Sequence, residues 1–198
     1  MAVRRTNIIL WLLLLIPYVC LIPAYIWYEY TLKNIKNSTF IIINKQELML
    51  YHYNFQGELL QKSKISCGKK FGNKEDIGDN KTPEGVFGIG QIDNSSTWSH
   101  DFADDSLGEI KGAYGPYFIR LIVPGQKGIG IHGTSVPNSI GTRASEGCIR
   151  MHNDDLVNLV KHLGTASVVV ITPSQSDIDT TLIEKVIKNK APKSKKRK

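Results

Sequence analysis

The chain has 198 residues, of which 41% are hydrophobic, enough for one domain with a buried core and short extensions. Its formal net charge is +7, but seven basic residues between Lys188 and Lys198 and the arginines at positions 4 and 5 account for more than this, leaving −2 for residues 6–187. A nucleic-acid-binding face needs positive charge on the folded domain itself, so the charge pattern argues against a nucleic-acid partner.

An uncharged run from Ile8 to Tyr28 follows two arginines near the N-terminus. At about 1.5 Å per residue, such a helix crosses the roughly 30 Å hydrocarbon core of a bilayer. The arginines hold the leading end in the cytoplasm and place the following domain outside. We therefore expect residues 1–28 to be a single-pass anchor in the cytoplasmic membrane. A cleaved secretory signal is the alternative, although the run lacks a good small-x-small cleavage site.

Residues 29–37 are predicted to be a linker, and residues 38–173 the main domain. Runs of β-branched and aromatic residues, separated by turn residues, predict strands over residues 39–44, 47–53 and 59–66. The glycine-containing loop over residues 67–85 lacks the Gly-x4-Gly-Lys-Ser/Thr pattern of a phosphate-binding loop, and no helix follows it. A nucleotide cofactor is therefore not expected.

The polar segment over residues 91–113 shows no periodicity and is predicted to be a flap over the site. It contains four potential metal ligands, but such donors are common on solvated loops, and no metal is predicted. These donors are His100, Asp101, Asp104 and Asp105.

Further strands are expected over residues 86–90, 116–123, 128–132 and 167–172. A helix is expected from Asn153, as N-cap, to Gly164, because apolar residues between them recur at helical spacing. Together the elements predict a mainly β fold, a sandwich or partly open barrel with one or two short helices. Residues 174–198 are expected to form an extension with a disordered basic tail suited to anionic polymer or lipid headgroups.

The segment from Ile131 to Met151 carries residues for acyl-transfer chemistry. His132 ends a predicted strand, and Cys148 follows Gly147 shortly before the predicted helix. A cysteine attacks as a thiolate, which a histidine base or nearby backbone amides can generate. Consecutive amides at Gly147 and Cys148 also suit an oxyanion hole. Arg150 suits a substrate carboxylate.

At this point the sequence resembles a known family. The motifs His132-Gly-Thr and Ser145-Glu-Gly-Cys-Ile-Arg-Met resemble the active-site signature of the L,D-transpeptidase catalytic domain family (YkuD type). Residues 78–87 and 115–121 resemble two further family segments, a Lys-Thr-Pro-x-Gly segment and the strand before the histidine. The resemblance implies a β-sandwich-like catalytic domain that acts on stem peptides of bacterial peptidoglycan without a cofactor.

The resemblance also implies roles. Cys148 would be the nucleophile and His132 the base, with Gly133 orienting the histidine through its carbonyl. The amides of Gly147 and Cys148 would form the oxyanion hole. The residues that would bind the substrate are Ser145, Arg150 and Tyr117.

Three functions remain open at this stage. An acyl-enzyme formed with release of D-Ala can pass its acyl group to an amine, as a transpeptidase does. It can instead pass it to water, as an L,D-carboxypeptidase or amidase does. A disulfide between Cys67 and Cys148 would instead make the domain a non-catalytic cell-wall-binding module. The chain departs from the family at Glu146, where many members carry histidine or lysine, and at Cys67, where a small hydroxyl residue is frequent.

Overall fold

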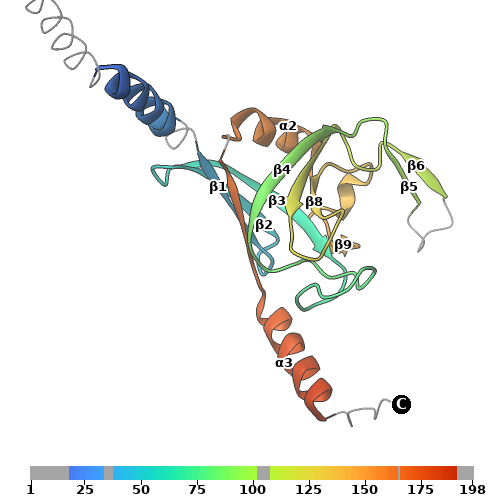
Figure 1. Cartoon of the computed structure of the whole chain (residues 1–198). Coiled ribbons are helices and arrows are strands. Elements are labelled where there is room, and N and C mark those ends of the chain that lie inside the picture. Colours follow the sequence, from blue (N-terminus) through green and yellow to red (C-terminus); the bar gives the residue numbers. More distant parts are fainter. Residues whose placement is uncertain (1–17, 34–37, 102–107, 165, 191–198) are drawn as a thin grey trace, which may run out of the picture.

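The computed structural model describes residues 18–33, 38–101, 108–164 and 166–190, drawn in colour in Figure 1. Residues 18–33 are helical. Within the described ranges, no helix combines the length and the apolar character needed to cross a bilayer. Much of the predicted membrane span lies in residues 8–17, outside the described residues, so the anchor stays a prediction.

The domain is built on one sheet of nine strands in the order β10-β8-β7-β4-β11-β1-β2-β3-β9. Strand β10 also pairs with β3, so the sheet closes on itself. These strands are β1 (Thr39–Asn44), β2 (Met49–Asn54), β3 (Leu59–Gly68), β4 (Gly85–Asn94), β7 (Tyr117–Ile122), β8 (Gly130–His132), β9 (Arg143–Ser145), β10 (Ile149–Met151) and β11 (Val168–Thr172).

The mainly β class is confirmed, and of the two predicted architectures, a sandwich or a partly open barrel, the sheet has the barrel form. One barrel-like sheet surrounds the core, because the three-residue strand β10 bridges β8 and β3. Pairing between strands distant in the sequence leaves no local signal, which is why the sequence did not decide between sandwich and barrel.

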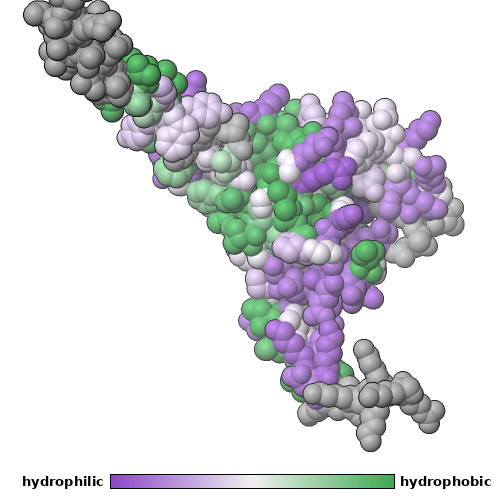
Figure 2. Space-filling model, in the orientation of Figure 1, coloured by the Kyte–Doolittle hydropathy of each residue, from purple (hydrophilic) through white to green (hydrophobic). Residues whose placement is uncertain are grey.

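Alternating side chains fill the interior of the barrel. In β1, Ile41 and Ile43 are fully buried, while their neighbours in the strand are partly exposed. The helix α2 (Asn153–His162) adds Leu156 and Leu159 to the same core. Apolar surface remains over the middle of the outer face, as Figure 2 shows, and polar surface covers the side of β5 and β6.

The helix α2 begins as predicted, but Asn153 does not cap it. The N-cap residue is His152, without a side-chain hydrogen bond. The Asn153 side chain turns the other way and accepts a hydrogen bond from the Thr134 amide (2.9 Å). Its amide oxygen thereby fixes the chain just beyond His132.

Two segments differ from their predictions. The predicted flap contains the end of β4 and a hairpin of β5 (Ser99–Asp101) and β6 (Glu109–Lys111). Residues 102–107, which include Asp104 and Asp105, lie outside the described residues. After β11, the predicted extension forms the helix α3 (Gln175–Lys190), and the basic residues beyond it are not described. A 3-10 helix, η1 (Pro137–Ser139), lies between β8 and β9 in the sequence. Figure 1 shows α2 and α3 at opposite ends of the sheet.

One buried histidine makes the stability of this fold depend on pH. His52 in β2 is fully buried, and burial, with a smaller effect of His162, lowers its pKa to about 4. Between pH 6.5 and 4 the unfolded chain therefore takes up a proton that the folded chain excludes, so stability is full above this window and falls as pH falls through it.

Between pH 7 and pH 4.5, the unfolding free energy of the wild type should fall by about 2 kcal/mol more than that of the His52→Leu variant. Urea unfolding at both values measures this difference. The exposed His162→Gln variant serves as the control and should keep most of the loss. An equal pH dependence in wild type and His52→Leu would contradict the assignment.

Candidate active site

Pairing between β8 and β10 brings the predicted histidine and cysteine together. The two strands run parallel, with Arg150 opposite His132. Side chains alternate along a strand, so Cys148, two residues before Arg150, projects to the same side. All three line one cavity of about 570 Å³.

The hydrogen bonding of His132 fixes its proton. The side chain is 2% exposed, and its Nδ1 lies 2.7 Å from the carbonyl oxygen of Gly133. A carbonyl can only accept, so Nδ1 carries the proton and Nε2 keeps its lone pair. Burial lowers the pKa of His132 to about 3; the bond to Gly133 opposes this, and the charges of Arg150 and His100 add to it. At neutral pH the ring is therefore an uncharged proton acceptor.

Two aromatic rings hold the imidazole in place. Phe118 lies opposite His132 in the β7–β8 ladder and stacks on it with the planes 9° apart and the centroids 5.4 Å apart. Tyr114 meets it edge-on at 4.9 Å. The sequence-based choice of Tyr117 as a substrate contact is not supported by this geometry. Tyr117 packs against the hydrophobic core, because strand alternation directs Phe118, not its neighbour, to the cavity.

The nucleophile candidate is a neutral thiol at rest. Burial raises the pKa of Cys148; a hydrogen bond from the Gly130 amide and the charges of Arg150 and Lys74 oppose this, and Glu146 adds to it. Its Sγ donates to the carbonyl oxygen of Gly128 (3.2 Å). The site thus holds a thiol beside a neutral imidazole, rather than the thiolate beside an imidazolium considered from sequence.

Cys67 and Cys148 are not bonded to each other. Both are free cysteines, and Cys67 is fully buried in β3. The disulfide on which the non-catalytic alternative depended is therefore absent from the structure, and Cys148 is left with its thiol at the cavity.

We call residues 145–148 the nucleophile loop. Its own first side chain braces it, because Ser145 Oγ donates to the Cys148 carbonyl (2.5 Å) and accepts from the Gly147 amide (3.1 Å). Gly147 has a φ of +140°, and a Cβ there would lie 2.8 Å from the Lys81 carbonyl oxygen. The Gly147 amide and the Ser145 hydroxyl therefore form hydrogen bonds that stabilise the conformation of the loop. The oxyanion role of Gly147 and the substrate contact of Ser145 stay predictions, and Ser145 lines the cavity.

A buried threonine that sequence reasoning left without a role supports the same loop. Thr82 Oγ1 donates to the Gly147 carbonyl (2.9 Å) and accepts from the Gly68 amide (2.8 Å). Thr82 belongs to the Lys-Thr-Pro segment noted in the sequence, so the signal was present, but its contact with a residue 65 positions away was not foreseeable.

Glu146 faces the cavity. Its Oε2 lies 3.2 Å from His100 Nε2, and His100 Nδ1 lies 3.1 Å from the Tyr114 hydroxyl. With Trp98, these side chains form one wall of the cavity, to which the predicted flap contributes Trp98 and His100. The carboxylate also raises the pKa of Cys148, although its effect is smaller than that of burial.

Most of the charged side chains that line the cavity are basic. Four basic side chains line it, and Glu146 is the only carboxylate among the described residues that do so. The basic residues are Lys74, Arg120, Lys127 and Arg150. Lys74 is paired with Asp79 and Arg120 with Asp93, and the excess of basic side chains suits a ligand that carries a carboxylate.

Residues 38–171 match the family model described as the L,D-transpeptidase catalytic domain (YkuD). The chain belongs to this family. YqjB of Bacillus subtilis and YkuD of Bacillus licheniformis, both provisionally named L,D-transpeptidases, are 32% identical over 54% of the chain and 44% identical over 31% of it. The chain spans 60% and 36% of their lengths.

Solved structures support the fold. L,D-transpeptidase 3 of Mycobacterium tuberculosis superposes with a TM-score of 0.51 at 14% identity, over 68% of this chain and 61% of that one. The catalytic domain of the L,D-transpeptidase of E. faecium superposes with a TM-score of 0.50 at 18% identity, over 69% of this chain and 98% of that domain. At these identities the likeness concerns the fold alone.

The neutral state of Cys148 and His132 predicts the pH dependence of alkylation. Because the pKa of Cys148 is raised, its reaction with iodoacetamide should be slow at pH 7 and still increase beyond pH 9. Peptide mass spectrometry of the full chain follows Cys148 separately from Cys20 and the buried Cys67. A rate that reaches its plateau below pH 7 would show a thiolate–imidazolium pair instead.

Proposed function

We propose that the chain is a peptidoglycan L,D-transpeptidase with Cys148 as nucleophile and His132 as general base. The observation that carries the proposal is the hydrogen bond from His132 Nδ1 to the Gly133 carbonyl, which reserves Nε2 for accepting a proton. Cys148 lines the same cavity, and family membership supports acyl transfer as the reaction class.

In the first half-reaction, Cys148 Sγ bonds to the carbonyl carbon before the terminal D-Ala of a stem tetrapeptide, and the thiol proton moves to His132 Nε2. The C–N bond then breaks, and the imidazolium returns the proton to the departing amine. D-Ala leaves, and a thioester remains on Cys148. The cationic side chains of Arg150 and Lys74 favour the negative charge that develops on the way.

In the second half-reaction, an amine attacks the thioester and loses its proton to His132. The C–S bond breaks, an amide forms, and the sulfur recovers the proton. Water in place of the amine gives hydrolysis and a free carboxylate, the carboxypeptidase or amidase alternative. The resting geometry is the same for both acceptors, so the products distinguish them.

The substrate class follows from the cavity and the family together. A stem peptide carries free carboxylates, and the basic residues around the cavity are suited to bind them. Arg150 is 7% exposed and lies opposite His132, so we assign it the carboxylate or oxyanion nearest the reacting carbonyl.

Incubation of the full chain with tetrapeptide muropeptides and an amine acceptor tests the proposal. We expect released D-Ala, a cross-linked product and, by intact-protein mass spectrometry, a thioester adduct on Cys148. Cys148→Ala should abolish all three, and His132→Gln should slow D-Ala release by about 10²- to 10⁴-fold. Circular dichroism of both variants provides the folding control. Equal products from wild type and Cys148→Ala would refute the proposal, and products unchanged by added amine would favour the hydrolase.

We also propose, from the apolar run alone, that residues 1–28 anchor the chain in the cytoplasmic membrane with the domain outside. In intact cells without an outer membrane, or in spheroplasts, added protease should then degrade the domain. The full chain should sediment with membranes and resist extraction by high salt. A protected domain, or a chain released by salt, would contradict the anchor.

A further inference from the structure

The helix α3 lies beyond the region that matches the family, which ends at residue 171. Even so, it packs against the loop between β3 and β4. Three of its residues, about one helical turn apart, bind this loop: Asp177 accepts from the Gly72 amide (2.8 Å), Thr181 from the Asn73 amide (3.3 Å), and Glu184 from Lys81 (2.7 Å). One face of α3 is therefore fixed to the loop that contains Thr82.

Asp177 is the most connected side chain on this face. Its carboxylate is fully buried and accepts from the amide (2.8 Å) and the hydroxyl (2.6 Å) of Ser174. It also binds two cations, Arg143 at 2.7 Å and Lys45 at 3.3 Å. Burial opposes ionisation, but the hydrogen bonds from Ser174 and Gly72 and the charge of Lys45 outweigh it and lower the pKa of Asp177 to about 2. The group is an anion that joins two basic residues.

The first cation leads to the start of the nucleophile loop. Arg143 is the first residue of β9, and Ser145 is its last. While Nη2 binds Asp177, Nη1 donates to the Gly68 carbonyl (3.3 Å). Asp177 thus holds the Arg143 side chain, which links β9 to β3. Arg143 lies two residues before Ser145, whose hydroxyl donates to the Cys148 carbonyl.

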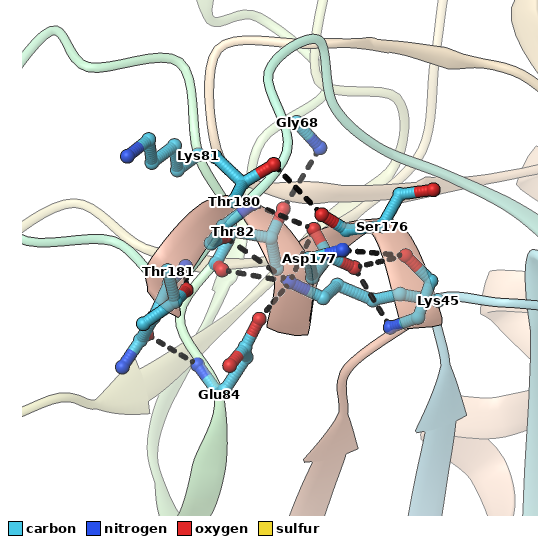
Figure 3. A network of polar contacts seen from close by, with 12 residues as sticks. Lys45, Gly68, Lys81, Thr82, Glu84, Ser176, Asp177, Thr180 and Thr181 are labelled. Atoms are coloured by element: carbon cyan, nitrogen blue, oxygen red, sulfur yellow. Dashed lines mark hydrogen bonds and ion pairs between the residues drawn. The ribbon is translucent and has the colours of Figure 1, made fainter. Parts of the chain in front are cut away.

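The second cation leads to the other end of that loop. Lys45 is fully buried; its Nζ binds Glu84 (2.7 Å) and the Thr82 carbonyl (3.4 Å), as Figure 3 shows beside Asp177. The Thr82 side chain in turn donates to the Gly147 carbonyl. The charge of Asp177 therefore helps, through Lys45, to place the Thr82 hydroxyl. This hydroxyl binds the carbonyl of Gly147, the residue before Cys148.

We propose that Asp177 is a positioning residue for the nucleophile loop, acting through Arg143 on one side and through Lys45 and Thr82 on the other. The inference rests on the proposed function for its effect on turnover. Its effect on the reactivity of the Cys148 thiol does not depend on which reaction the enzyme performs.

The test compares Asp177→Asn with Asp179→Asn in the full chain. Both changes remove one carboxylate from α3, but Asp179 is exposed and accepts a hydrogen bond from the side chain of Gln175 on the same helix (3.0 Å). We expect Asp177→Asn to lower kcat by about 10- to 100-fold with little change in KM, as expected for a misplaced nucleophile. Alkylation of Cys148 by iodoacetamide should slow at least about fivefold, because a displaced loop weakens the hydrogen bond from Gly130 that favours the thiolate.

A second pair of variants keeps the test decisive if Asp177→Asn does not fold, which near-ultraviolet circular dichroism and thermal melting will show. Thr82→Val removes the hydroxyl nearest the loop and should slow Cys148 alkylation in the same way, whereas Thr82→Ser should restore it. In a folded double variant, the effects of Asp177→Asn and Thr82→Val should be less than additive, because they share the route through Lys45, and what Asp177→Asn still adds measures the route through Arg143.

Two results would overturn the inference. One is a folded Asp177→Asn protein with the same alkylation rate as Asp179→Asn. The other is Thr82→Val with the same alkylation rate as Thr82→Ser. If the wild type releases no D-Ala, the proposed function fails, but the alkylation comparison still decides whether Asp177 positions the loop.

Discussion

The site depends on the double pairing of β10, a strand of three residues that joins β8 on one side and β3 on the other. The pairing with β8 sets His132 beside Arg150 and brings Cys148 to the same cavity. The pairing with β3 closes the sheet and brings the nucleophile loop near Gly68 and Thr82. The pairings of β10 therefore both close the barrel and assemble the site.

The site combines groups that are individually unreactive. The thiol is kept neutral chiefly by burial, and the imidazole is kept neutral by the same cause. Under the proposed mechanism, reaction requires proton transfer from sulfur to Nε2 as the substrate arrives, in a cavity whose basic side chains favour the resulting negative charge. Rigid aromatic contacts from Phe118 and Tyr114 hold the imidazole, so the geometry does not depend on an ion pair between the two groups.

Much of the fold and of the candidate site could be predicted from local sequence. The strands β1 to β4, β7, β8 and β11, the helix α2 and the candidate residues His132 and Cys148 follow from periodicity and from the motifs around them, whereas the three-residue strands β9 and β10 were not predicted. The parts that could not be predicted are contacts between distant segments. Phe118, rather than Tyr117, faces the histidine because of the register of β7 against β8. Thr82 and Asp177 reach the nucleophile loop only because the sheet closes and α3 folds back, and neither event has a signature in neighbouring residues.

The neutral thiol of Cys148 also bears on oxidative damage. Peroxides oxidise the thiolate far faster than the thiol, and they progress from sulfenic to irreversible sulfinic and sulfonic acids. A nucleophile whose pKa is raised by burial spends little time in the vulnerable form. The environment that keeps the thiol neutral should therefore also slow the loss of the sulfur to oxidants.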